Sequence, residues 1–255
     1  QNIKAIKMYP KGATTNSDSG ISDFGDFYHL FEVMEENGVI LSVHGEVTDE
    51  KVDVFDRERV FIEKVLTEII KRFPNLKIVL EHITSADAVK FIEEQSMIAA
   101  TITIHHLMVN RNIMLSKGIR PDFYCAPILK TEDDRRALVE AAITGKDKFF
   151  LGTDSAPHLE VNKIASCGCA GIFSSPMAIP LLIELFEKHH SLEKIECFMS
   201  KNGRAFYGLR QQKDRVRYVK RSKPIEAIKD IKTNEGKITV FNPYSETFWE
   251  RENKV

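Results

Sequence analysis

Four residues in this chain have side chains that could bind or bridge a divalent metal ion. They are Lys7, His44, His82 and Asp154, and each follows a short apolar run. Imidazole and carboxylate groups are common zinc ligands, and burial can lower the pKa of a lysine until its amine is neutral. If the four side chains meet at one point, they form the centre of a metal-dependent enzyme.

Each of the four residues lies at or near the carboxyl end of a segment that resembles a β-strand. Helical or loop sequence separates one segment from the next, which predicts an α/β fold with a parallel sheet. Functional residues of such proteins lie at the carboxyl ends of the strands, so we expect the four side chains to converge there. The expected strands are residues 3–9, 39–43, 77–80, 98–104 and 149–151.

Helical spacing of apolar residues predicts the elements that cover this sheet. Ser85 is expected to cap one helix, and either Ser22 or Asp23 is expected to cap another. The expected helices are residues 23–36, 57–73, 86–94, 132–144, 176–189 and 192–198.

The composition of the chain changes after Gly208, where basic residues become dense. We therefore divide it into residues 1–208 and a C-terminal extension of residues 209–255. Lysine and arginine are crowded between Arg210 and Lys223. A basic binding patch is one interpretation. A solvated edge strand is the favoured one, because cations at a sheet edge discourage pairing with other chains. A further strand is expected at residues 237–241.

Composition narrows the class of protein. The 255 residues include 36 Lys and Arg against 37 Asp and Glu, for a formal net charge of −1. This balance argues against a nucleic-acid-binding or anionic-membrane protein, which normally has a basic excess. The hydrophobic content of 43% suits a sizeable α/β core. Four cysteines in a chain this long are expected to be reduced thiols of a cytoplasmic protein.

Lys7 has two interpretations. A lysine that faces two histidines and a cation would lose its proton, and the neutral amine could take up carbon dioxide to form a carbamate that bridges two metal ions. Alternatively, Lys7 points outward and is solvated. The periodicity of residues 3–9 leaves both interpretations open.

Several longer segments resemble dihydroorotase, in particular the shorter bacterial type within the amidohydrolase superfamily. The resemblance runs in register from residue 3 to Gly208 and is weak beyond it. The segments that carry it include Lys7-Met-Tyr-Pro, Ala13-Thr-Thr-Asn-Ser, Val43-His-Gly-Glu-Val-Thr, Glu81-His-Ile-Thr, Tyr124-Cys-Ala-Pro-Ile-Leu-Lys, Gly152-Thr-Asp-Ser-Ala-Pro-His and Ser166-Cys-Gly-Cys-Ala-Gly.

The resemblance implies a TIM-type (β/α)8 barrel, of which this chain would supply roughly the last five βα units. Lys7 would be carboxylated and would bridge two zinc ions. His44 and His82 would bind one zinc ion and Asp154 the other. Asp154 would also act as the general acid and base when N-carbamoyl-L-aspartate cyclises to L-dihydroorotate in pyrimidine biosynthesis. Glu46 and Glu81 are expected to orient the two histidines.

The resemblance also implies which residues contact the small-molecule substrate. The loop of residues 10–20 would fold over the ligand, and a histidine and a main-chain group would hold its carboxylate. Cys167 and Cys169 are expected to form a tight loop that presents Ala170, in preference to a metal pair. The implied substrate-binding residues are Thr14, Thr15, His44, Ala126, His158 and Ala170.

One part of the family pattern is missing. The family has a His-x-His pair on its first barrel strands, and no His-x-His occurs in these 255 residues. We therefore expect the functional molecule to include a further segment of about three βα units, ~90 residues. A homodimer is expected as well. Two alternatives remain open: another cyclic amidase of the hydantoinase or dihydropyrimidinase kind, and a catalytically inactive dihydroorotase-like scaffold subunit.

Overall fold

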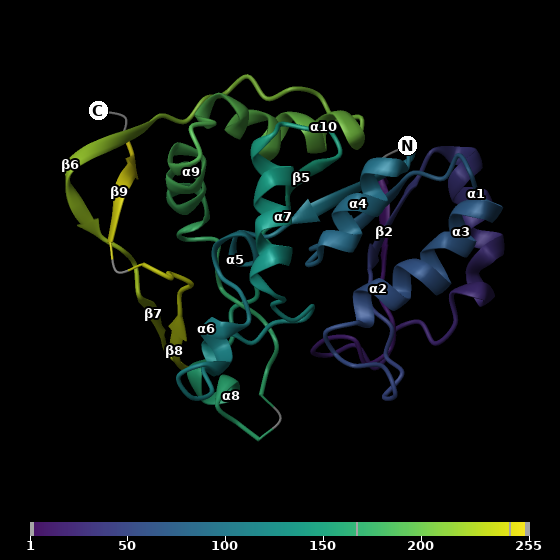
Figure 1. Cartoon of the computed structure of the whole chain (residues 1–255), viewed down its shortest axis with the longest axis horizontal. Helices are drawn as coiled ribbons and strands as arrows, with labels where there is room; N and C mark the ends of the chain where they lie inside the picture. The colour runs from purple at the N-terminus through teal and green to yellow at the C-terminus, as the bar shows by residue number, and fades with distance from the viewer. Residues whose placement is uncertain (1–2, 167, 245, 253–255) are drawn as a thin grey trace.

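Five parallel strands form the centre of the molecule in the computed structural model of this chain (Figure 1). The structure describes residues 3–166, 168–244 and 246–252. The strands pair in chain order, and each is parallel to its neighbour, as the sequence predicted. They are β1 (Ala5–Met8), β2 (Ile40–His44), β3 (Ile78–Glu81), β4 (Ile98–Ile102) and β5 (Phe149–Leu151).

Helices separate the strands and pack on the sheet, as a parallel sheet requires. The predicted helical ranges lie within a few residues of the observed ones up to α9. The helices are α1 (Tyr28–Asn37), α2 (Arg57–Phe61), α3 (Thr67–Arg72), α4 (Ala86–Glu94), α5 (Ile104–Met108), α6 (Asn112–Leu115), α7 (Glu132–Ile143), α8 (Glu160–Lys163), α9 (Ala178–Lys188) and α10 (Asn202–Phe206).

Shorter helical turns complete these elements. Ile62–Leu66 is a π-helical turn between α2 and α3, so one helical run covers the range expected for a single helix. The predicted helix 192–198 is instead divided between a 3-10 turn, Leu192–Lys194, and a π-helical turn, Cys197–Lys201. Two more 3-10 turns are Phe24–Phe27 and Pro121–Phe123.

Side-chain caps explain where several helices begin. The Asp23 carboxylate accepts the N–H of Gly25 at 2.7 Å, and the Ser85 hydroxyl accepts the N–H of Ala88 at 3.2 Å. Thr103 was expected to lie within a strand, but its hydroxyl accepts the N–H of His106 at 3.2 Å. This cap starts α5, so β4 ends two residues earlier than predicted.

The two faces of the sheet have different surroundings. Residues of β2, β3 and β4 that point toward the helices join the main core, in which Leu41, Ile78 and Leu80 are fully buried. The opposite face carries a smaller apolar cluster near the amino ends of the strands. Its buried members are Ile40, Val79, Ala99 and Phe150, with Ala5, Phe206 and Tyr207 packed against them.

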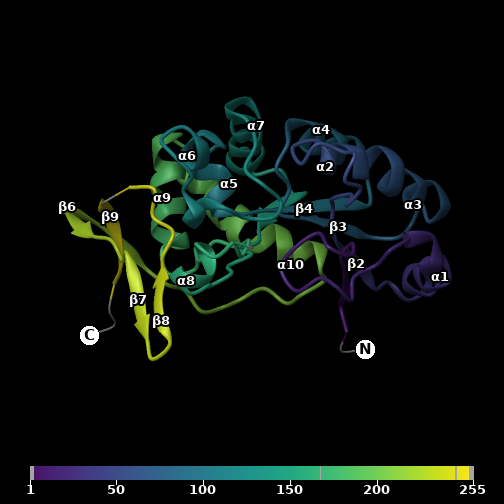
Figure 2. The same cartoon turned by 90° about the horizontal axis from the view of Figure 1, so that it is seen from below.

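The C-terminal residues form two antiparallel strand pairs, at the end of the molecule opposite α1 (Figure 2). β6 (Tyr218–Glu226) pairs with β9 (Glu246–Arg251), and β7 (Asp230–Thr233) pairs with β8 (Gly236–Thr239). β6 has the exposed basic side chains expected of an edge strand. Phe241 is one link between these residues and the rest of the chain: its N–H donates to the carbonyl of Phe173 at 2.7 Å. Thr247 is another, since its hydroxyl donates to the Glu184 carboxylate.

Among the described residues, no helix combines the length and the apolar character that a membrane crossing requires.

Candidate active site

The four predicted metal-binding residues lie at the carboxyl ends of the strands. Lys7 is in β1, His44 ends β2, His82 follows β3, and Asp154 follows β5. Side chains alternate between the faces of a strand, so Lys7 lies on the same face as Ala5, and His44 on the same face as Ile40. The small apolar cluster therefore forms the floor beneath these polar groups.

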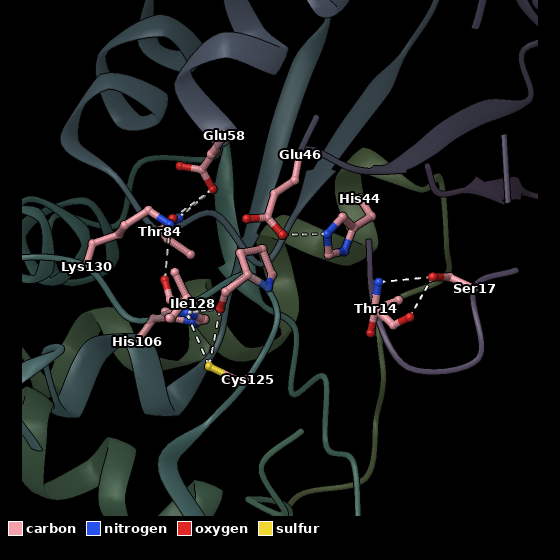
Figure 3. A network of polar contacts seen from close by, with 11 residues as sticks. Thr14, Ser17, His44, Glu46, Glu58, Thr84, His106, Cys125, Ile128 and Lys130 are labelled. Atoms are coloured by element: carbon pink, nitrogen blue, oxygen red, sulfur yellow. Dashed lines mark hydrogen bonds and ion pairs between the residues drawn. The ribbon is translucent and has the colours of Figure 1, made fainter. Parts of the chain in front are cut away.

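The imidazole rings of His44 and His82 are in contact. Their centroids lie 4.7 Å apart in a T-shaped arrangement, and the residues are only 2% and 3% exposed. Nε2 of His44 lies 2.8 Å from a carboxylate oxygen of Glu46 (Figure 3), the partner expected for it. A carboxylate in this position fixes the orientation of a ligating imidazole.

His82 is held by its backbone and keeps one ring nitrogen free. Its N–H donates to the hydroxyl of Thr101 at 2.7 Å, and its φ of 43° turns the chain out of the strand. Nδ1 is buried and has no hydrogen-bond partner among the described residues. Burial, together with the charges of His44 and Lys7, holds the pKa of His82 well below its ordinary value. A neutral imidazole with a free nitrogen is the form that binds metal.

The charges of Lys7 and Asp154 each affect the pKa of the other residue. Burial lowers the pKa of Lys7 to about 8, against the opposing effect of the Asp154 charge. Asp154 is exposed on one side, yet partial desolvation raises its pKa, opposed by Lys7 and His44. The charges of Lys7 and His44 act on both His82 and Asp154, so the structure brings all four predicted residues within electrostatic reach.

Glu81 does not orient His82 as expected. Its carboxylate forms an ion pair with the Lys7 ammonium and accepts a hydrogen bond from the Ser42 hydroxyl. Lys7 and Ser42 are register partners on neighbouring strands, so one carboxylate spans β1, β2 and β3.

The donor types suit a divalent metal ion, since imidazole and carboxylate groups are common zinc ligands. The ligand atoms of His44, His82 and Asp154 do not form a trio within 4.8 Å of one another; among the described residues only His105, His106 and Cys125 do.

Three of the predicted substrate-binding residues are in direct contact. The hydroxyl of Thr15 lies 3.2 Å from the amide nitrogen of Ala170 and 3.3 Å from its carbonyl oxygen. Nε2 of His158 lies 3.1 Å from the same carbonyl oxygen. Gly171 permits this approach, because an added Cβ would lie 2.7 Å from Nε2 of His158.

Thr14 and Ala126 are near this group without a described side-chain contact to it. Thr14 belongs to an internal turn of the loop: its N–H donates to the Ser17 hydroxyl at 3.1 Å (Figure 3). Ala126 precedes a cis peptide bond to Pro127. Cys169 lies beside Ala170, and Cys167 lies outside the described residues.

Two buried charged residues were not anticipated from the sequence. Glu58 accepts hydrogen bonds from Thr84, at 2.8 Å from its N–H and 3.1 Å from its hydroxyl, and another from the hydroxyl of Ser85 at 2.5 Å. It thus fixes the segment that follows His82 (Figure 3). Burial raises the pKa of Glu58. Lys163 donates to three main-chain carbonyl groups around Ala170.

A separate buried trio consists of His105, His106 and Cys125, whose potential ligand atoms lie within 4.8 Å. The thiol of Cys125 and Nε2 of His106 both contact the carbonyl of Pro127, at 3.2 and 3.1 Å. Burial raises the pKa of the Cys125 thiol to about 12 and lowers that of His106 to about 3. These neutral groups pack beneath the Ala126 segment.

Comparisons with known proteins agree with this architecture. The model described as Amidohydrolase family matches residues 1–218. A protein named dihydroorotase from Shewanella oneidensis is 55% identical over 226 residues, which cover 88% of this chain and 66% of that protein. The chain therefore spans slightly less than two thirds of the length of that relative.

Two solved structures share the fold over nearly all of the chain. Dihydroorotase from Campylobacter jejuni has a TM-score of 0.88 and 32% identity, with 98% of this chain and 72% of that chain covered. Dihydroorotase from Saccharomyces cerevisiae in complex with 5-fluoroorotic acid has a TM-score of 0.87 and 34% identity, with 99% and 75% covered. The parallel sheet is thus part of a TIM-type barrel, and this chain belongs to the amidohydrolase family.

Proposed function

We propose that this chain forms most of a zinc-dependent dihydroorotase, which interconverts N-carbamoyl-L-aspartate and L-dihydroorotate in de novo pyrimidine biosynthesis. The similar proteins carry that name, and their family is metal-dependent, generally with zinc. The observation that carries the proposal is the buried pair His44 and His82, 4.7 Å apart, beside Lys7 and Asp154.

Lys7, His44, His82 and Asp154 would hold two zinc ions. The free Nδ1 of His82 and the lowered pKa of Lys7 support this assignment. An amine that is readily deprotonated can react with carbon dioxide, so Lys7 is proposed to carry a carboxylate that bridges the ions. Bound zinc would supply Lewis-acid activation of water and of an amide carbonyl.

Asp154 is proposed to move the proton. In the hydrolytic direction, its carboxylate takes a proton from the attacking water and delivers it to the ring nitrogen that leaves. A partly desolvated carboxylate with a raised pKa suits both steps, because proton transfer is efficient when the pKa lies closer to the working pH.

His158 and the main chain of Ala170 are proposed to hold the substrate carboxylate, and Thr15 to contact the substrate from the loop of residues 10–20 that covers it. Their mutual contacts support a shared binding surface. Thr14 would add a contact from the same loop, Ala126 would contact the ring through its main chain, and His44 would approach the substrate from the metal side.

We also propose that residues 1–208 belong to a closed barrel that further polypeptide completes with a His-x-His pair, and that the functional molecule is a homodimer. Residues 209–255 would be an extension that packs on the barrel. Among the described strands, β1 and β5 each pair with only one neighbour. Lys7 keeps 39% of its side chain exposed, so the site has room for a further ligand.

A cytoplasmic location is proposed as well. Cys125, Cys169 and Cys197 are free cysteines. Free thiols are typical of reducing compartments, where disulfides are rare.

The experiment is a cyclisation assay with N-carbamoyl-L-aspartate, performed on the polypeptide that contains this chain, together with zinc analysis. We expect bound zinc and turnover of this substrate but not of hydantoin or dihydrouracil. Preferential turnover of hydantoin or dihydrouracil would support the other cyclic amidases. Absence of both zinc and turnover would support an inactive scaffold.

A further inference from the structure

Lys163 is a buried lysine whose ammonium group lies behind the loop that carries Ala170. It ends α8, and only 6% of its surface is exposed. Its Nζ donates to the carbonyl oxygens of Tyr124, Cys169 and Gly171 at 2.8, 2.9 and 2.7 Å. An ammonium group has three donors, so each donor has a main-chain acceptor.

The carbonyl oxygens of the two residues that flank Ala170 point to Lys163, away from the groups that contact Ala170 itself. Cys169 and Gly171 direct their carbonyl oxygens at Lys163. The amide nitrogen and carbonyl oxygen of Ala170 instead lie 3.2 and 3.3 Å from the hydroxyl of Thr15. The Cys169 carbonyl and the Ala170 N–H belong to one planar trans peptide and point in opposite directions, so the bond to Lys163 directs the Ala170 N–H toward Thr15.

The carbonyl of Tyr124, the third acceptor of Lys163, connects the Ala170 loop to the segment that contains Ala126. The carbonyl of Tyr124 accepts a hydrogen bond from Lys163 and another from the N–H of Gly171 at 3.0 Å. One ammonium group therefore sets the positions of both main-chain segments proposed to contact the substrate.

The charge of Lys163 also reaches the binding surface. Burial is the main cause that lowers the pKa of Lys163 and of His158, and the Lys163 charge adds to the effect on His158. A cation that disfavours protonation of His158 will favour an anionic ligand group at the same place.

We propose that Lys163 is a positioning residue for the substrate carboxylate, which holds the Ala170 main chain toward the ligand and places a fixed positive charge behind it. The inference rests on the proposed function, because it takes Ala170 and His158 as the carboxylate-binding groups.

Lys148 provides a matched control. Its ammonium group also donates to three main-chain carbonyls, those of Ile92, Glu93 and Gln95, at the end of α4. Lys148 directly precedes β5, so it lies at the amino ends of the strands, away from the site. Lys148→Met removes the same number of hydrogen bonds from a part of the fold that does not contact the ligand.

The test compares the affinity of the whole, metal-loaded protein for 5-fluoroorotate and for its carboxamide. In Lys163→Met we expect binding of the carboxylate to weaken about tenfold or more, and the preference for carboxylate over carboxamide to fall about as much. Lys148→Met should lower the thermal midpoint and leave that preference unchanged. Zinc content should stay at the parent level in both variants.

If Lys163→Met does not fold, the same two affinities are measured in Lys163→Gln, which keeps a hydrogen-bond donor but loses the charge. It too should lose the preference for the carboxylate. A parental preference in either folded variant of Lys163 overturns the inference while the proposed function stands. If the parent itself does not prefer the carboxylate, the proposed carboxylate site is wrong, and the role of Lys163 falls with it.

Discussion

His82 and Asp154 adopt backbone conformations that non-glycine residues rarely accept. Their φ values are 43° and 40°, and only Asn16 and His190 share this property among the described non-glycine residues. Such conformations cost of the order of 1–3 kcal/mol each. Two proposed metal ligands thus have strained backbone conformations, and that of His82 is held by the hydrogen bond from its N–H to the Thr101 hydroxyl.

Lys7→Ala should remove most of the bound metal, because it deletes the proposed bridge between the two ions. Loss of a direct ligand should weaken metal affinity by at least the roughly 10–100-fold that loss of an outer-shell partner costs. Short carboxylic acids should restore part of the metal and activity. Metal analysis of the dialysed variant is the measurement.

Thr15→Ala is the control for that experiment. Thr15 contacts Ala170 and no proposed metal ligand in the described structure, so this variant should keep its zinc and lose turnover. Equal zinc content in Lys7→Ala and the parent would rule out the bridging role.

The residues that could be predicted are those whose position in a strand defines their place in the fold. His44, for example, ends an apolar strand and lies at the carboxyl edge as expected. Glu58 could not be predicted, because its role depends on distant partners. Lys163 could not be predicted either, because no sequence pattern shows that three main-chain carbonyls converge on one lysine. Glu58 lies between two arginines, as on a solvated helix face, and only Thr84 and Ser85, 26 and 27 residues away, explain its burial.

At the scale of elements, strands were predicted more reliably than helix ends. Buried parallel strands have continuous apolar runs, and β5 coincides with its predicted range. α5 was missed because its start depends on one Thr103 cap after an apolar run that resembles strand throughout. The regular helix expected at residues 192–198 was wrong, since Leu192–Lys194 and Cys197–Lys201 adopt other helical forms.

α7 gives a pH-dependent prediction through Glu132 in its first turn. Hydrogen bonds from Arg135, Asn110 and Arg136, with that from Arg135 the strongest influence, lower the pKa of Glu132 from 4.5 to about 2. Because the pKa of Glu132 is lower in the folded state, its carboxylate stabilises the protein at pH values above the pKa of the unfolded state. This contribution is lost as the pH falls from 4.5 to about 2.

Glu132→Gln should therefore lower the free energy of unfolding at neutral pH by about 1 kcal/mol, a modest value because the carboxylate is 36% exposed. The difference from the parent should shrink toward zero near pH 2. Urea unfolding across this pH range measures it. The control is Glu68→Gln, which removes an exposed ion pair to Arg72. A difference between Glu132→Gln and the parent that does not change with pH would contradict the prediction.

At the scale of the whole molecule, the C-terminal extension is joined to the rest through few buried groups. Phe241 is 5% exposed, and its ring centroid lies 6.1 Å from those of His105 and Phe123. The sequence predicted a strand near Phe241, but the contacts to α5 and to residues 121–123 depend on tertiary packing that no local pattern encodes.

Phe241→Ala should destabilise the protein by about 3 kcal/mol, because it leaves a cavity between the extension and the barrel. Phe248 is a phenylalanine of the same extension that is 38% exposed, and Phe248→Ala should cost less than about 1 kcal/mol. Denaturant unfolding compares the two. Equal losses would show that Phe241 does not anchor the extension.

The order of the sheet has a consequence for biosynthesis. Each strand from β2 to β5 pairs with the strand made immediately before it on the ribosome, and none of these pairs has to wait for a later strand to be inserted between its members. Nascent chains emerge amino end first at ~5–20 residues per second, slowly compared with the formation of local structure. The sheet can therefore grow by one βα unit at a time during translation, and Asp154 and Lys163 are added last to a surface that already presents both histidines.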